Sequence, residues 1–252
     1  MMRLAKNGDK GAFDGHLRKT VLKGRIASDS IAMNASRHKV LNSPAIRRMP
    51  SYLHWLLRIQ ESGKKTVSTT ELADYMRIGW IVVRKDIALT GISGRPRIGY
   101  DIGKLIVAIR AYLGWQTMHS ATLVGAGALG SAILGYDEFV RYGLNIETVF
   151  DTDPAKIGTD VHGHTILSLV SLPEVFRNNV PEIAVLCVPA SSAQDVADLL
   201  VAQGVRCIWN FANVTLAVPE NVIVQREVLA GGLAMLSVKM KKAAGANIDI
   251  ED

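Results

Sequence analysis

One short segment constrains the fold of this chain more than any other. Residues 123–130 read Leu-Val-Gly-Ala-Gly-Ala-Leu-Gly, an apolar strand that runs into three spaced glycines and then into a helical stretch. In such a segment the first glycine permits a tight turn, the second lets a pyrophosphate approach the backbone, and the third lets the helix pack closely on the strand. A second apolar strand ends at Asp151, about 20 residues downstream, where a carboxylate would bind the adenosine ribose hydroxyls. The segment therefore predicts a dinucleotide-binding domain.

The charges near Asp151 favour NAD(H) over NADP(H). Asp153 follows closely, no arginine comes directly after, and two carboxylates would repel a 2′-phosphate. The cofactor phosphates would lie on the N–H groups at the positive end of the helix that follows the glycines. A glycine turn without a ligand is the alternative, and the aspartate at the expected distance makes it the weaker one.

Apolar strands alternate with helical stretches through the rest of this domain, which we place at residues 119–226. The expected strands are 121–124, 146–150, 183–188, 205–209 and 222–224, and the expected helices between them are 128–142, 169–177 and 190–200. Continuous apolar strands between helices predict a parallel, doubly wound sheet covered on both faces, which is the Rossmann fold. A terminal helix over 227–242 and a flexible tail over 243–252 complete the expected organisation.

Residues 43–100 carry the pattern of a winged helix-turn-helix domain. Ser43-Pro44 predicts the start of a first helix that ends at Ser62-Gly63. Ser68-Thr69-Thr70-Glu71 is a capping box that opens a short second helix, and Arg77-Ile78-Gly79 is a tight turn before a third helix over 80–90. The basic, glycine-punctuated residues 91–100 predict a hairpin wing. We expect a connecting helix and a linker over residues 101–118. Asp101 would cap the helix, and Gly114 would end it.

The charges are distributed unevenly between the two halves. Residues 1–100 contain 19 Lys and Arg against 7 Asp and Glu, whereas residues 101–252 contain 10 against 16. A basic half joined to an acidic half is typical of a nucleic-acid-binding module attached to a regulatory domain. Residues 1–42 show no sustained helix or strand period, and we expect a disordered basic arm there.

The sequence disfavours membrane and secreted classes. No apolar run reaches the roughly 18 residues of a membrane span, and residues 1–8 lack the apolar core of a secretory signal. Cys187 and Cys207 are the two cysteines, and each lies among apolar residues, which indicates core thiols in a reducing compartment rather than a redox pair. We expect a cytoplasmic protein.

Catalytic machinery is hard to find. A dehydrogenase needs a proton relay beside the nicotinamide, yet none of the six histidines lies in a recognisable catalytic pattern and no nucleophile motif is visible. His162-Gly163-His164 in an expected loop has too few ligands for a metal, so we expect no metal site. A bound cofactor without chemistry indicates sensing, and the chain is not expected to be an enzyme.

Together these motifs resemble the Rex family of bacterial redox-sensing transcriptional repressors over about residues 44–242. The segments that carry the resemblance occur in the same order: Met49-Pro50-Ser51-Tyr52-Leu53, Ser68-Thr69-Thr70-Glu71-Leu72-Ala73, Val83-Arg84-Lys85-Asp86, Gly99-Tyr100-Asp101, the glycine loop, residues 150–158, Val188-Pro189-Ala190, Ala193-Gln194, Asn210-Phe211-Ala212 and Leu229-Ala230-Gly231. The resemblance implies a homodimer with a domain-swapped terminal helix. It also implies binding to an inverted-repeat operator in double-stranded DNA, with NADH closing the dimer and releasing the DNA.

The resemblance also assigns residues to each site. DNA binding is expected of Arg47, Arg48, Ser68, Arg84, Lys85, Arg95 and Arg97. Cofactor binding is expected of Gly125, Ala126, Gly127, Ala128, Leu129, Gly130, Asp151, Asp153, Lys156, Val188, Pro189, Asn210, Phe211 and Tyr100. The redox switch is expected at His54, Tyr100 and Glu227, where the family uses a basic first-helix residue and an acid at the start of the last helix. A histidine can change its charge near neutral pH, which would make this link pH-sensitive.

The chain departs from the family at several of these places. Pro96 occupies the usual position of the wing arginine, Ala88-Leu89-Thr90 replaces a Ser-Tyr-Phe stretch, and Ser237-Val238-Lys239 replaces the aromatic end of the last helix. Three rival hypotheses remain open: an NAD-dependent oxidoreductase with an N-terminal appendage, a regulator that answers to CoA or another nucleotide, and a DNA-binding scaffold with a vestigial nucleotide domain.

Overall fold

The computed structural model describes residues 43–244. The expected basic arm 1–42 and residues 245–252 of the expected tail lie outside the described residues. Among residues 43–244 no helix is long and apolar enough to cross a membrane.

The chain divides into two compact units, and the boundary between Trp55 and Leu56 falls inside helix α2 (Ser43–Glu61). In the first unit α2 buries Met49, Tyr52 and Leu53 at spacings of three and four residues, which places them on one face of the helix. The predicted first helix and its end before Ser62 are confirmed.

The second unit begins with the remainder of α2 and continues into a helix-turn-helix. Ser68 accepts a hydrogen bond from the Glu71 N–H and Glu71 accepts one from the Ser68 N–H, so the predicted capping box opens α3 (Thr69–Met76). Arg77 ends that helix in the left-handed region at φ 54°. Helix α4 (Trp80–Ala88) follows, as the sequence predicts.

The predicted wing contains a tight turn over residues 95–99, in which Arg95 and Gly99 exchange two backbone hydrogen bonds of 2.8 and 2.9 Å as an isolated bridge. The strand that follows, β2 (Tyr100–Asp101), pairs antiparallel with β1 (Thr66–Val67), which precedes α3. Gly99 has φ +90°, and a Cβ there would enter the carbonyl of Val67, so only glycine fits.

Helix α5 (Ile102–Leu113) connects the wing to the large sheet. Its first turn is capped by Asp101, whose carboxylate accepts from the Lys104 N–H, and its end is closed by Gly114 in the left-handed region, as predicted.

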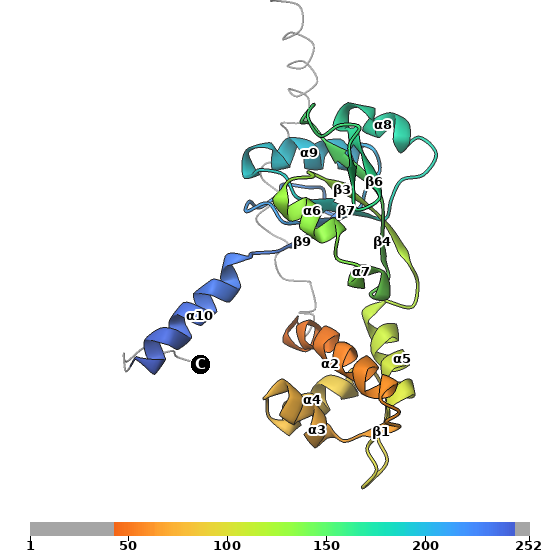
Figure 1. Cartoon of the computed structure of the whole chain (residues 1–252), viewed down its shortest axis with the longest axis vertical. Coiled ribbons are helices and arrows are strands. Elements are labelled where there is room, and N and C mark those ends of the chain that lie inside the picture. Colours follow the sequence, from red (N-terminus) through yellow and green to blue (C-terminus); the bar gives the residue numbers. More distant parts are fainter. Residues whose placement is uncertain (1–42, 245–252) are drawn as a thin grey trace, which may run out of the picture. The chain divides into compact units, whose positions relative to one another are not determined.

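The second unit contains a seven-stranded sheet, several strands of which are labelled in Figure 1. The strand order is β5-β6-β4-β3-β7-β8-β9. The strands are β3 (His119–Val124), β4 (Leu144–Asp151), β5 (Asp160–Val161), β6 (His164–Ser168), β7 (Ile183–Leu186), β8 (Cys207–Asn210) and β9 (Ile223–Arg226). All neighbouring strands pair in parallel except β5 with β6. The chain runs outward from β3 in one direction and then from β7 in the other, so the order reverses between these two strands. This is the Rossmann arrangement, which binds its ligand at the reversal point.

Helices cover both faces of the sheet because successive strand residues point to opposite sides. On one face Val124, Phe150 and Leu186 pack with α8 (Leu172–Val175) and α9 (Ala190–Ala202). On the other face Leu123, Val149 and Val185 pack with residues of α6 (Ala128–Leu134) and α7 (Glu138–Arg141). Both faces are covered by helices, which explains the continuous apolar strands in the sequence.

The single helix expected over 128–142 is wrong, because the chain breaks between α6 and α7 at Gly135. A Cβ at Gly135 would lie 2.6 Å from the imidazole of His162, so this glycine permits a close approach of the β5–β6 turn. Gly135 is the C-cap of α6, so the helix ends at this glycine.

The region 160–177 also differs from the expectation. His162-Gly163, expected in a loop, is the turn of the β5–β6 hairpin, with φ values of 51° and 80° that suit a two-residue hairpin turn. The helix expected over 169–177 is shorter, consisting of a 3₁₀ turn, η1 (Leu169–Ser171), followed by α8.

The last helix, α10 (Ala230–Ala243), begins three residues later than the expected start at residue 227. Glu227 instead continues directly from β9, and its N–H donates to the carbonyl of Asn210 over 2.9 Å. This backbone bond extends the strand pairing by one residue, which delays the start of the helix. Helix α10 buries none of its residues within the described chain.

Candidate dinucleotide-binding site and DNA-binding surface

The glycine loop between β3 and α6 has the geometry that a dinucleotide needs. Gly125 has φ +100°, and a Cβ there would lie 2.5 Å from the carbonyl oxygen of Cys187. A Cβ at Gly130 would clash with the carbonyl oxygen of Gly125, which shows that α6 packs tightly against the glycine loop that precedes it. At Gly127 a Cβ would meet nothing within 4 Å, and this open space is where a pyrophosphate can approach the backbone. The tight turn at Gly125 and the close packing at Gly130 are as predicted, whereas the approach of a pyrophosphate at Gly127 stays a prediction.

Asp151, at the end of β4, lies beside this loop. Its Oδ2 accepts from the Ala126 N–H over 2.8 Å, and its Oδ1 accepts from the Asp153 N–H over 2.8 Å. Burial alone would raise the pKa of this carboxyl, but the hydrogen bonds from Asp153, Lys156 and Ala126 outweigh it and lower the pKa. The group is therefore held as a carboxylate, the form that accepts ribose hydroxyls.

Lys156 neutralises part of this acidic cluster. Its Nζ lies 3.1 Å from Asp151 Oδ2 and 3.6 Å from Asp153 Oδ2, and the bond to Asp151 raises the pKa of the lysine. Two carboxylates against one ammonium leave a net negative charge at the expected ribose position. The geometry brings Asp151, Asp153 and Lys156 together with the loop, as expected.

The other predicted cofactor residues lie at the carboxyl ends of β7 and β8. Val188 follows β7, and its side chain would contact a Cβ at Gly125. Pro189 precedes α9. The side chain of Asn210 donates to the Val214 carbonyl and accepts from the Ala212 N–H, each over 2.9 Å, so it orders the loop after β8.

The side chain of Glu227 contacts the carboxyl end of β8 through Trp209, a residue that the sequence analysis did not single out. The indole Nε1 of Trp209 donates to Glu227 Oε1 over 3.3 Å, and the Trp209 ring packs on Phe211 with centroids 4.8 Å apart. The aromatic residues on either side of Asn210 in the sequence were the available signal. The structure thus links an expected switch residue to an expected cofactor residue.

The two cysteines cannot form a disulfide in this fold. Cys207 pairs with Ile183 at the start of β7, whereas Cys187 follows the end of that strand. Four residues along a strand span about 13 Å, beyond the reach of a disulfide. Burial raises the pKa of the Cys187 thiol to about 12. Both cysteines are half-buried rather than fully buried, so the expected core thiols are confirmed only in part.

The expected DNA-binding residues are distributed over three elements. Arg84 and Lys85 are exposed on α4, and Arg95 and Arg97 are exposed on the wing, where Arg97 occupies the turn with φ 63°. The Ser68 hydroxyl serves as the cap of α3.

Arg47, Arg48 and the switch residue His54 lie on α2. Tyr100 lies in β2, where its ring faces Gly94 across the wing. The three switch positions thus lie on separate elements, and their interaction stays a prediction.

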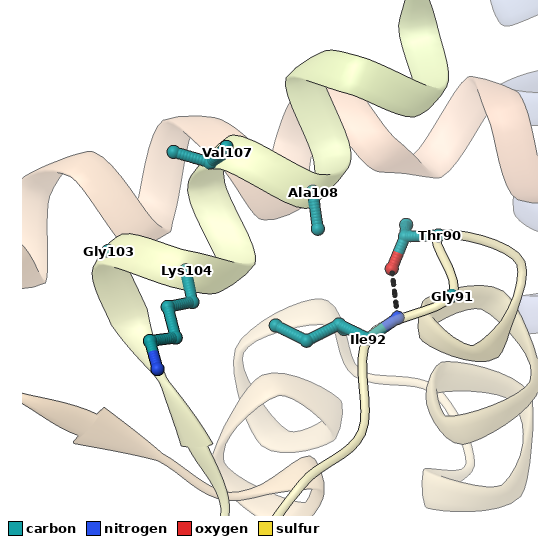
Figure 2. A pocket seen from close by; sticks show the side chains of 7 residues that line it. All are labelled: Thr90, Gly91, Ile92, Gly103, Lys104, Val107 and Ala108. Carbon is teal, nitrogen blue, oxygen red and sulfur yellow. Dashed lines mark hydrogen bonds between the residues drawn. The ribbon is translucent and has the colours of Figure 1, made fainter.

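A cavity of about 440 Å³ lies between α5 and the segment after α4 (Figure 2). It is lined by Thr90, Gly91, Ile92, Gly103, Lys104, Val107 and Ala108. None of these seven residues belongs to the expected cofactor-binding or DNA-binding sets. Within residues 43–244 no three His, Cys, Asp or Glu side chains are grouped as a metal site. The cavity therefore does not coincide with the expected cofactor site, which stays a prediction at the glycine loop.

Comparisons with known proteins agree with this organisation. Residues 116–214 match a family model described as "CoA binding domain", and residues 42–88 match one described as "Putative DNA-binding protein N-terminus". The crystal structure of RSP, a Rex-family repressor, in complex with NAD⁺ and operator DNA matches with a TM-score of 0.73 and 28% identity, covering 82% of this chain and 95% of that one. The structure of RSP with NADH matches with a TM-score of 0.72, covering 82% and 97%.

Two curated relatives cover most of the chain. The redox-sensing transcriptional repressor Rex of Treponema denticola is 41% identical over 205 residues, which are 81% of this chain and 98% of that protein. The Rex protein of Rhodopirellula baltica is 37% identical over 81% of this chain and 86% of its own length. With an N-terminal helix-turn-helix, a Rossmann sheet and relatives matched over nearly their whole length, this chain belongs to the Rex family of redox-sensing transcriptional repressors.

Proposed function

We propose that this chain is a DNA-binding repressor that senses the NADH/NAD⁺ ratio, and that NADH binding closes a homodimer and releases the operator. The observation that carries the proposal is the presence, in one chain, of a basic helix-turn-helix and a glycine loop beside an ionised Asp151. The chain would act in the cytoplasm, where the operator DNA is, without catalytic turnover.

The cofactor half of the proposal rests on the ribose position. NAD(H) presents free 2′- and 3′-hydroxyls there, and a carboxylate such as Asp151 accepts hydrogen bonds from both. NADP(H) and CoA each carry a phosphate on this ribose, which would meet the net negative charge of Asp151, Asp153 and Lys156. The same charge argument disfavours a regulator that answers to CoA.

The DNA half rests on the exposed cations. Arg84 and Lys85 on α4 would contact the major groove, and Arg95 and Arg97 on the wing would reach the narrow minor groove of A·T tracts. Arg47, Arg48 and Ser68 would contact phosphates. We assign residues 43–100 to this domain, 101–118 to the connection and 119–226 to the cofactor domain.

The proposed assembly rests on α10. Leu229, Leu233, Leu236 and Met240 are spaced at i, i+4, i+7 and i+11, so they share one helical face, and each is more than half exposed. An apolar face of this kind needs a partner surface, and we propose that a second copy of the chain supplies it. The exchange of α10 between copies would make the redox response a property of the dimer.

The two sites would communicate through the populations of a closed and a DNA-competent dimer. A ligand shifts such an equilibrium only by its differential affinity for the two forms. A ~100-fold preference of NADH over NAD⁺ for the closed form supplies about 2.7 kcal/mol, enough to change the occupancy of a marginal operator.

The residues that distinguish the two redox forms would be His54, Tyr100 and Glu227. Glu227 is bonded to Trp209, which packs on Phe211 at the end of β8, so a change at the cofactor can reach the segment that leads into α10. We propose that this connection couples the nicotinamide to the dimer.

The main rival, an oxidoreductase, would need a proton relay. The charged side chains beside the glycine loop, Asp151, Asp153 and Lys156, are already paired with one another. They would lie at the ribose end of the cofactor, where no proton is transferred. Oxidation of NADH in the presence of a carbonyl substrate would favour the rival.

The test is a fluorescence-anisotropy titration of a palindromic, A/T-rich operator with NADH or NAD⁺ added at fixed salt, because phosphate contacts make the affinity salt-dependent. Release of the operator by NADH but not by NAD⁺ supports the proposal, and operator binding that neither cofactor changes contradicts the sensor.

The variant Glu227→Ala should still bind NADH but should no longer release DNA in response to it. Full release of DNA by NADH in this variant would show that Glu227 is not part of the switch.

A further inference from the structure

The exposed face of α4 is centred on an isoleucine. The helix buries Val83, Asp86 and Ile87, and successive helical residues are separated by about 100°. The opposite face therefore centres on Ile81, whose side chain is 52% exposed. A large apolar residue lies at the position that a docking partner of this helix meets first.

Two basic residues flank this isoleucine on the same face. Arg84 and Lys85 follow Ile81 by three and four residues, so their side chains are its neighbours on the helix surface. Ala88, at i+7, continues the same exposed stripe. A partner that fits this face must offer negative charge at its edges and an apolar group at its centre.

Double-stranded DNA offers this combination in its major groove. Phosphates line both edges of the groove, and the C5-methyl group of thymine is the apolar group on its floor. Apolar side chains contact this methyl, whereas arginine and lysine pair with guanine. The occupant that fits the stripe is therefore a base step that contains thymine, next to the bases or phosphates that Arg84 and Lys85 contact.

We propose that Ile81 contacts a thymine methyl group in the major groove and thereby selects thymine at one position of each operator half-site. This inference rests on the proposed function, because it requires α4 to enter the groove. It adds a specificity-determining residue that carries no charge.

The test replaces thymine by 2′-deoxyuridine, which removes the methyl group and leaves the base pair intact. An operator is first selected by the full chain from a random-sequence duplex pool, and each thymine is then replaced symmetrically in both half-sites. Burial of one methyl contributes about 4-fold in affinity, so the wild-type protein should lose about 15-fold at one symmetric pair of positions. Ile81→Ala should bind the thymine and deoxyuridine operators equally at that pair.

Val107→Ala is the matched control, because Val107 is 58% exposed but lies on α5. It should keep the wild-type ratio of thymine to deoxyuridine affinities. If no thymine shows the loss, or if Ile81→Ala keeps it, the inference is wrong while the repressor function stands. If the pool yields no enriched site, the proposed function fails and the inference fails with it.

Discussion

At Gly127 an added Cβ would meet nothing within 4 Å, whereas at Gly130 it would enter the carbonyl of Gly125. Gly127→Ala should therefore keep the wild-type melting temperature within a few degrees, since its φ of −78° suits alanine. It should still lose NADH affinity at least tenfold, because the methyl group occupies the approach of the pyrophosphate. Thermal unfolding and a fluorescence titration with NADH measure the two effects.

Gly130→Ala is the counterpart of that variant. Its methyl group meets backbone, which cannot rotate away, so the free energy of unfolding should fall by about 1–3 kcal/mol or more. An unchanged NADH affinity in Gly127→Ala, or an unchanged stability in Gly130→Ala, would contradict the roles assigned to these glycines.

Residue roles were predictable where the backbone alone determines them. The glycine loop and Asp151 follow from spacing, because a tight turn and a ribose-binding acid need fixed positions along the chain. The bond from Trp209 to Glu227 depends on the pairing of β8 with β9, which no local pattern reveals. The side chain of Asn210, by contrast, bonds within its own loop, to Ala212 and Val214, and this residue was predicted from the family resemblance.

At the scale of elements, the sequence predicted those helices whose ends carry their own signals. The cap at Ser68 and the stops at Arg77 and Gly114 lie where local chemistry places them. The break at Gly135 was missed although glycine is a poor helix former and ends α6 here. The hairpin around His162-Gly163 was missed because histidine is not the usual residue at the first turn position, although Gly163 supplies the positive φ of the second.

His119 fixes the start of β3 to two neighbouring elements. Its Nδ1 lies 2.8 Å from Oε2 of Glu182, the residue that precedes β7. Its Nε2 lies 3.2 Å from the carbonyl oxygen of Gly114, at the end of α5. The hydrogen bond with Glu182 raises the pKa of His119. A raised pKa contributes stability that is fully present below the unfolded pKa and is lost as the pH rises through the folded value.

His119→Gln should therefore melt below the wild-type protein at pH 5.5, and the difference should shrink at pH values well above 7. Melting curves of both proteins across this range measure it. A difference that grows with pH would show that the neutral imidazole, rather than the ion pair, stabilises this junction.

At the scale of the whole molecule, α10 determines the expected assembly. Leu233 and Leu236 lie on its exposed apolar face, whereas Met235, 59% exposed, lies to the side of that face. Replacing Leu233 and Leu236 by glutamate should convert the dimer to a monomer at micromolar concentration, because charge would be buried at the interface. Met235→Glu is the control. Light scattering after size-exclusion chromatography measures the mass, and a double variant that remains dimeric would exclude this face as the interface.

The uneven charge distribution has its explanation at the same scale. The excess of Lys and Arg in residues 1–100 suits a polyanionic partner, and the acidic excess in residues 101–252 suits a separate regulatory domain. Composition therefore predicted two sites. It could not predict their coupling, which depends on how two copies pack in each ligand state.

The coupling itself is tested most directly by measuring NADH affinity with and without operator DNA. If NADH lowers DNA affinity by some factor, DNA must lower NADH affinity by the same factor, because binding free energies are reciprocal. The dissociation constant of NADH, obtained from its fluorescence at fixed salt, should rise about 100-fold when the protein is saturated with operator, while that of NAD⁺ changes little. An NADH dissociation constant that is the same with and without operator would show that the two sites act independently, and would contradict the account of a redox-sensing repressor.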